Sequence, residues 1–228
     1  MIFECGSLYH IYNQGNNRQN IFFNRDNYLF FLKKLNLYIL PHADILAWCL
    51  MPNHFHIMVY VKQVFFTDGV TPSHPVSKPA GHPFSKSAGH PFSKTPSHPV
   101  IKPAGHTVSF NDNIGILLRS YSRAINLQQN RVGALFREET KAECITPIDG
   151  ITPSFYNTGS GTLIHISNPE KEYPQICFDY IHFNPVSAHL VVRPEEWEFS
   201  SYRDYCGMRG GKLINRKIAE GFSIEFSQ

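Results

Sequence analysis

A central β-strand is indicated by the stretch Met51-Pro52-Asn53-His54-Phe55-His56-Ile57-Met58-Val59-Tyr60-Val61. Its β-branched and aromatic side chains favour a strand over about His54–Lys62. Because successive side chains of a strand alternate between its two faces, His54 and His56 point together and Phe55 points the other way, into a core. Two imidazoles on one face provide half of a coordination site for a divalent metal. They also fit a hydrogen-bonded pair at a strand edge, so further ligands are needed to identify a metal site.

Apolar patterns on both sides of this strand predict the other elements. Two more strands are expected at Ser7–Asn13 and Asp44–Leu50, and three helices at Arg25–Leu40, Asn111–Gln129 and Pro174–His182. The strand–helix–strand–strand–helix order predicts an α+β fold, an antiparallel sheet with helices packed on one face. An apolar patch from Ile218 to Phe226 has no role that the sequence assigns.

The composition indicates a folded globular protein. The chain has 228 residues, 42% of them hydrophobic, which allows one domain or two small ones. No apolar run is long enough to span a bilayer, and no signal sequence is expected at the N-terminus. The five cysteines are scattered and never have CxxC spacing, so neither a disulfide framework nor a cysteine zinc site is indicated. A cytoplasmic setting is therefore expected.

A tandem repeat of eight residues runs from Ser73 to Ala104, as SHPVSKPA, GHPFSKSA, GHPFSKTP and SHPVIKPA. Proline at this density excludes helix and central-strand pairing, so the repeat is expected to be a low-complexity surface insertion at about 70–107. Its evenly spaced histidines, at 74, 82, 90, 98 and 106, leave zinc binding open as an alternative. A second loop insertion, rich in Gly, Ser, Thr and Pro, is expected at about 146–167.

The net charge of +3 depends on the repeat. Its four lysines, taken from 21 Lys and Arg, leave 17 basic against 18 acidic side chains. The overall charge therefore gives only weak support for a nucleic-acid partner, and a DNA-binding surface would depend on local placement of Arg and Lys.

The expected helix at Asn111–Gln129 has an apolar stripe that includes a tyrosine. Its members, at helical spacing, are Ile114, Leu117, Leu118, Tyr121 and Ile125. Tyr121 fits a core residue whose hydroxyl is hydrogen-bonded. It also fits a nucleophile, because a deprotonated phenol can form a covalent intermediate.

Several blocks follow one another in a recognisable order. They are Tyr9-His10, Asn13–Phe23, Met51–His56, Arg119–Arg123 with Asn126, Gly133–Phe136, Tyr180–Val186 and Trp197–Tyr202. Together they resemble the single-tyrosine HUH transposases, especially the REP-associated tyrosine transposases and related insertion-sequence transposases. The resemblance covers most of the chain from about residue 7 to 206, and it implies a single transposase domain over 1–228 that the two insertions interrupt.

The resemblance implies a ferredoxin-like or RRM-like HUH core and a metal-dependent DNA strand transferase. His54 and His56 would hold Mg²⁺ or Mn²⁺ against a phosphate of single-stranded or hairpin DNA. Tyr121 would be the catalytic nucleophile and would form a 5′-phosphotyrosine intermediate. No membrane partner is implied, and a homodimer is a further possibility. Arg18, Arg119, Arg123, Arg131, Arg137 and Lys141 are the candidates for DNA-binding phosphate contacts.

One position departs from the family pattern. The family places a third polar metal ligand about one turn after the nucleophile, and one turn after Tyr121 stands Ile125, which cannot coordinate a metal. Asn126 is the nearest carboxamide but is offset by about 100° around the helix axis. This departure leaves a second function open, a DNA-hairpin-binding protein with reduced or no cleavage activity.

Overall fold

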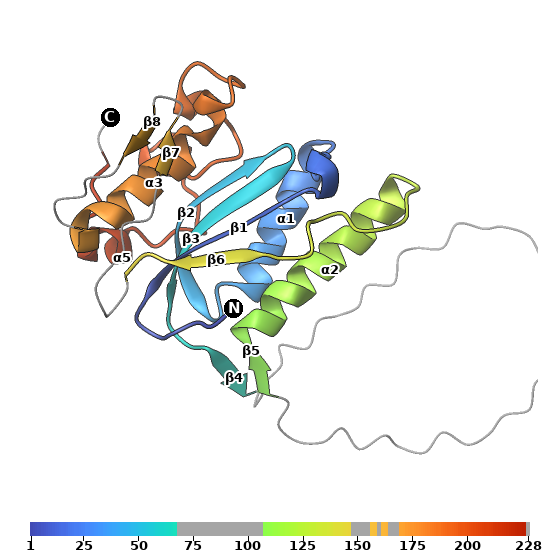
Figure 1. The fold of residues 1–228 in the computed structure, drawn as a ribbon, viewed down its shortest axis with the longest axis horizontal. Coiled ribbons are helices and arrows are strands. Elements are labelled where there is room, and N and C mark those ends of the chain that lie inside the picture. Colours follow the sequence, from blue (N-terminus) through green and yellow to red (C-terminus); the bar gives the residue numbers. More distant parts are fainter. Residues whose placement is uncertain (68–106, 147–155, 159–160, 164–168, 227–228) are drawn as a thin grey trace, which may run out of the picture.

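The computed structural model describes residues 1–67, 107–146, 156–158, 161–163 and 169–226 (Figure 1). The octapeptide repeat, with the histidines of the zinc-binding alternative, lies outside the described residues. So does most of the second expected insertion, of which two short strands, β7 (Tyr156–Thr158) and β8 (Gly161–Leu163), are described.

The centre of the fold is a four-stranded antiparallel sheet. Its strands are β1 (Leu8–Gln14), β2 (Ala43–Met51), β3 (His54–Val61) and β6 (Lys141–Cys144), in the order β2-β3-β1-β6. The α+β class and the antiparallel sheet are therefore confirmed. Strand β6 was not expected, and it pairs with β1 so that β1 is not at the edge.

Two helices cover one face of the sheet, but the expectation that every helix packs on that face does not hold for the third, described below. They are α1 (Arg25–Tyr38) and α2 (Phe110–Gln128). Ser109 caps α2 by accepting from the backbone N–H of Asp112, and the Asp112 carboxylate accepts from the Ser109 N–H in return. Phe31 of α1 and Phe55 of β3 meet in the core between helices and sheet, with ring centroids 5.1 Å apart.

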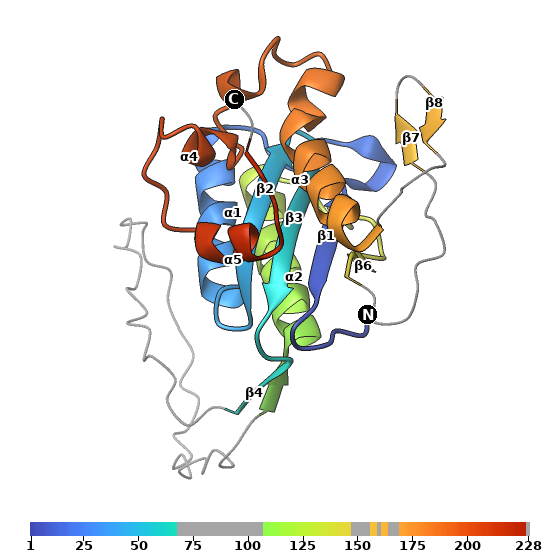
Figure 2. The same cartoon turned by 90° about the vertical axis from the view of Figure 1, so that its left-hand side faces the viewer.

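A third helix, α3 (Pro169–Ser187), covers the opposite face (Figure 2). Cys49 of β2 packs there with Phe178 and Ile181 of α3 in a second core. The C-terminal apolar patch has its role here, since Ile224 is buried in the same cluster. Helix α3 begins before the expected start at Pro174 and runs past the expected end at His182. It continues through Pro185 although an internal proline removes the backbone hydrogen bond to the carbonyl of residue 181 and crowds that carbonyl.

The remaining elements are short. They are η1 (Asn16–Arg18), β4 (Phe65–Thr67), β5 (Thr107–Ser109), η2 (Pro194–Glu196), α4 (Tyr202–Tyr205) and α5 (Arg216–Gly221). The C-terminal segment covers the free edge of β2: the N–H of Leu50 donates to the Phe199 carbonyl, and the N–H of Asn215 donates to the Ile45 carbonyl. Covered in this way, the edge is not available for pairing with another chain.

Because the imidazole of His182 is buried, we predict that acid lowers the stability of the fold. It lies 2.7 Å from the Ser201 hydroxyl, and burial lowers its pKa to about 3. Between pH 6.5 and 3 the unfolded chain therefore binds a proton that the folded chain does not, and the free energy of unfolding falls as the pH falls. We expect His182→Phe to reduce the slope of this loss by up to about 1.4 kcal/mol per pH unit in urea titrations. An unchanged slope would contradict the prediction.

Candidate metal and DNA site

The two histidines of β3 lie on the same face of the sheet, as the alternation predicts. Phe55 between them is 2% exposed and belongs to the core beneath α1 and α2. The rings of His54 and His56 face α3, and their centroids are 5.0 Å apart. The site can therefore be completed only by groups on the α3 side of the sheet.

Two side chains of α3 contact the histidines, Tyr180 and Asn184. They are four residues apart, so they lie on the same side of the helix. The ring of Tyr180 meets that of His56 edge to face, with centroids 5.3 Å apart. The Asn184 carboxamide lies between the imidazoles: its Oδ1 is 3.1 Å from His54 Nε2 and its Nδ2 is 3.4 Å from His56 Nε2.

The hydrogen bonds around His54 leave two lone pairs facing each other. Asn53 Nδ2 donates to the Arg18 carbonyl, so its Oδ1, 2.6 Å from His54 Nδ1, accepts from that nitrogen. A neutral imidazole protonated at Nδ1 carries a lone pair at Nε2. That lone pair faces the Asn184 oxygen, which is also an acceptor. A cation between them would remove the mismatch.

Burial keeps the imidazoles of the site neutral. It lowers the pKa of His54, and it lowers that of His56 well below 6.5, with further lowering by His10 and His54. Neutral imidazole is the form that binds metal. Among the described residues no three His, Cys, Asp or Glu side chains cluster as a metal site. The donor set here is two imidazoles and one carboxamide, so it fits a divalent cation with open positions for water and phosphate.

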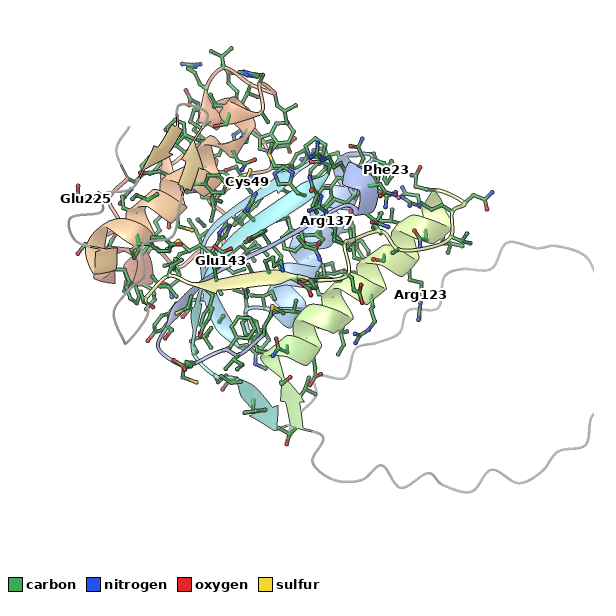
Figure 3. The ribbon with its side chains drawn as sticks, in the orientation of Figure 1. Phe23, Cys49, Arg123, Arg137, Glu143 and Glu225 are labelled. Carbon is green, nitrogen blue, oxygen red and sulfur yellow. The ribbon has the colours of Figure 1, made fainter. Side chains whose placement is uncertain are left out.

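A cleft of about 400 Å³ opens beside these groups. Its walls come from β1, β3, α3 and the segment that leads into β6, and they include Tyr12, His54, His56, Arg137, Glu139, Lys141 and Tyr180. The side chain of Lys141 pairs with Glu139. Arg137, labelled in Figure 3, forms no ion pair that is seen among the described residues. An anionic backbone entering the cleft would meet both cations.

The structure does not bring Tyr121 to the histidines. The side chain is on α2, on the far side of the sheet, and is 0% exposed. Its hydroxyl donates to the Ile21 carbonyl at 2.8 Å, and burial raises its pKa. A phenol that is enclosed by core residues and separated from the histidines by the sheet cannot reach a phosphate held at His54 and His56. The core interpretation of Tyr121 is the one that fits.

The two residues considered for the third ligand position lie on the same side as Tyr121. Ile125 is 1% exposed and belongs to the core under α2. Asn126 donates from Nδ2 to the Gly133 carbonyl at 2.8 Å. Neither can reach the histidines on the α3 face, so the expectation that Asn126 completes the site is wrong; the carboxamide that lies there is Asn184.

The six basic candidates divide into groups. Arg137 and Lys141 line the cleft. Arg18 is exposed on η1, where its carbonyl accepts from Asn53. Arg131 donates to Gln19 of the same loop region. Arg119 and Arg123 are exposed on α2, and Figure 3 shows Arg123 directed away from the sheet. Arg137 and Lys141 therefore lie at the cleft, Arg18 and Arg131 are not among the residues that line it, and the α2 pair lies on the other side of the sheet.

Tyr180 and Asn184 were not chosen from the sequence, although a signal was present. The segment Tyr180-Ile181-His182-Phe183-Asn184-Pro185 has a tyrosine with a carboxamide one turn later. The segment around Tyr121 has isoleucine there. A carboxamide one turn after the tyrosine, which the family pattern expects, is therefore present after Tyr180 and absent after Tyr121.

The structure is similar to that of a REP-associated tyrosine transposase bound to a REP hairpin. The TM-score is 0.50 at 14% sequence identity, over 94% of this chain and 86% of the other. At this identity the likeness shows the fold. No protein-family model matches the sequence, and no curated protein does. None of the helices in the described part of the chain is long and apolar enough to cross a membrane.

The placement of Tyr121 predicts a structural phenotype for its substitution. Tyr121→Phe removes a buried hydrogen bond and leaves the Ile21 carbonyl without this donor. We expect the free energy of unfolding to fall by about 1–2 kcal/mol, measured by urea denaturation. A loss of DNA chemistry without any loss of stability would contradict the structural role.

Proposed function

We propose that this protein is a DNA strand transferase of the tyrosine transposase type, with Tyr180 as the nucleophile. The observation that carries the proposal is the meeting of Tyr180 and Asn184, one turn apart on α3, with both histidines of β3 at an open cleft. The shared fold with a hairpin-bound REP-associated tyrosine transposase supports DNA as the partner.

His54, His56 and Asn184 would hold a Mg²⁺ or Mn²⁺ ion. When bound, such an ion neutralises charge on the non-bridging oxygens of a phosphodiester. The chain's own residues then have separate tasks. Asn53 holds His54 in the tautomer whose Nε2 lone pair points into the site. Arg137 and Lys141 attract and place the DNA backbone in the cleft.

Tyr180 would attack the phosphorus. It is 47% exposed at the cleft, so its phenolic proton can leave to solvent. Burial of part of the side chain raises its pKa, whereas its hydrogen bond with Asn184 lowers it. Attack forms a Tyr–O–P bond and breaks the bond from phosphorus to the 3′-oxygen, which takes up a proton. Reversal by another 3′-hydroxyl joins two strands and needs no external energy source.

One copy of the chain supplies every group in this site. Tyr180 and Asn184 belong to the same chain as His54 and His56, so the proposal needs no second copy. Weak metal binding was expected because an isoleucine, Ile125, stands one turn after Tyr121. With Tyr180 as the nucleophile, the residue one turn later is Asn184, and this expectation no longer applies. Hairpin binding without cleavage is therefore an outcome of the test below.

Covalent capture tests the nucleophile. We expect wild-type protein, mixed with Mn²⁺ and labelled single-stranded DNA that carries hairpins with randomised flanks, to give an adduct that survives denaturing electrophoresis. Tyr180→Phe should lower the adduct by at least about 10³-fold, because it removes the oxygen that bonds to phosphorus. Tyr121→Phe is the matched control and should retain it. An adduct in Tyr180→Phe would overturn the assignment, and DNA binding with no adduct in wild type would identify a binding protein.

Metal affinity tests the ligand set separately from cleavage. We expect Asn184→Ala to weaken Mn²⁺ binding by at least about tenfold, because it removes one of three protein ligands. Asn184→Asp keeps an oxygen ligand and should bind at least as tightly as wild type. Phe183→Ala, at an exposed neighbour on α3, is the control. Calorimetric titration with Mn²⁺ alone provides the measurement. Equal affinity in Asn184→Ala and wild type would exclude Asn184 as a ligand.

A further inference from the structure

A third imidazole, that of His10, lies behind the two proposed metal ligands. It comes from β1, and its Nε2 is 2.9 Å from His56 Nδ1. The rings are stacked with centroids 5.1 Å apart. His10 is only 7% exposed and is not among the residues that line the cleft. It therefore contacts His56 without contacting what enters the cleft.

The strand register places His10 diagonally from His56. The direct partner of His56 on β1 is Tyr12, and the direct partner of His10 on β3 is Met58. Diagonal neighbours on one face of an antiparallel pair lie within reach of large side chains. The backbone thus fixes the distance between the two rings, and no loop is involved.

The hydrogen bonds also indicate which of the two imidazoles donates its proton to the other. His56 Nε2 faces the Nδ2 donor of Asn184, so Nε2 is the acceptor of that contact and carries no proton. The proton of His56 is then on Nδ1, and it is donated to His10 Nε2. His10 acts as the acceptor that keeps the metal-facing nitrogen of His56 free.

We propose that His10 is a positioning residue of the metal site, which orients the His56 ring and fixes its tautomer. This inference rests on the proposed function. Groups behind a ligating histidine commonly set its orientation and its basicity, and their removal typically costs 10- to 100-fold in metal affinity. The acceptor in such pairs is usually a carboxylate or a carbonyl. Here it is an imidazole, that of His10.

Two substitutions at position 10 separate the hydrogen bond from packing. His10→Gln can place its side-chain oxygen near the site of Nε2 and still accept the His56 proton. His10→Phe keeps a ring in the space but accepts no hydrogen bond. We expect His10→Phe to weaken Mn²⁺ binding by about 10- to 100-fold and His10→Gln to stay within about threefold of wild type, by calorimetric titration or paramagnetic resonance. Tyr60→Phe, on the same face of β3 but packed against Phe222 and outside the cleft, is the control.

Nitrogen-15 NMR of the histidine rings in metal-free protein gives a second readout. Wild type should show His56 protonated at Nδ1. His10→Phe should show a mixture of His56 tautomers while its unfolding temperature stays close to that of wild type, because a ring still fills the buried space. Mn²⁺ binding by His10→Phe as tight as wild type, or a wild-type His56 protonated at Nε2, would overturn the role of His10. A wild-type protein that binds no Mn²⁺ but shows the Nδ1 tautomer would overturn the metal site and leave the His10–His56 contact established.

Discussion

The alternation of side chains along β3 is the constraint on which the rest of this structure depends. The side chain of Phe55 is buried in the core beneath α1 and α2, so that face of the strand must point into the core. The side chains of His54 and His56 therefore point to the other face, which α3 covers. A shift of one residue in the register would place both imidazoles in the core and the phenyl ring in the cleft. The packing of the core and the composition of the site are thus set by the same three residues.

The site also depends on burial. The imidazoles lie far enough below the surface for desolvation to keep them neutral, and they still open on a cleft. Their hydrogen bonds to Asn53 and His10 run away from the cleft, so the nitrogens that face it are left as acceptors. A protein interior usually pairs every lone pair with a donor. The exception at His54 and Asn184 lies where a cation is proposed to bind.

Much of the fold followed from local patterns, but those patterns did not show that Tyr121 lies on the other side of the sheet from the histidines. Period-two and period-3.6 spacing gave three strands and the two helices on the core side to within a few residues. Both Tyr121 and Tyr180 lie on helices, and the periodicity of a helix does not state which face of a sheet the helix covers. That depends on how the loops connect the elements. Helix α3 was also predicted too short at both ends, since it begins at Pro169 and continues through Pro185, which was taken as its end. Strand β6, with only four residues, has too little alternation to be recognised.

The β4–β5 pair has a consequence for how this chain can vary in length. Thr67 and Thr107 are paired across two antiparallel strands, and the N–H of Phe110 donates to the Val64 carbonyl at the start of α2. The entry and exit of residues 68–106 are thereby joined at the end of β3 remote from His54, roughly 23 Å away along the strand at about 3.3 Å per residue. Gain or loss of whole octapeptides by replication slippage would change the size of this segment and leave the first turn of α2 and the cleft in place. Because of this hairpin, the chain can gain or lose octapeptides at this point, a change in length that would disrupt the sheet at most other positions.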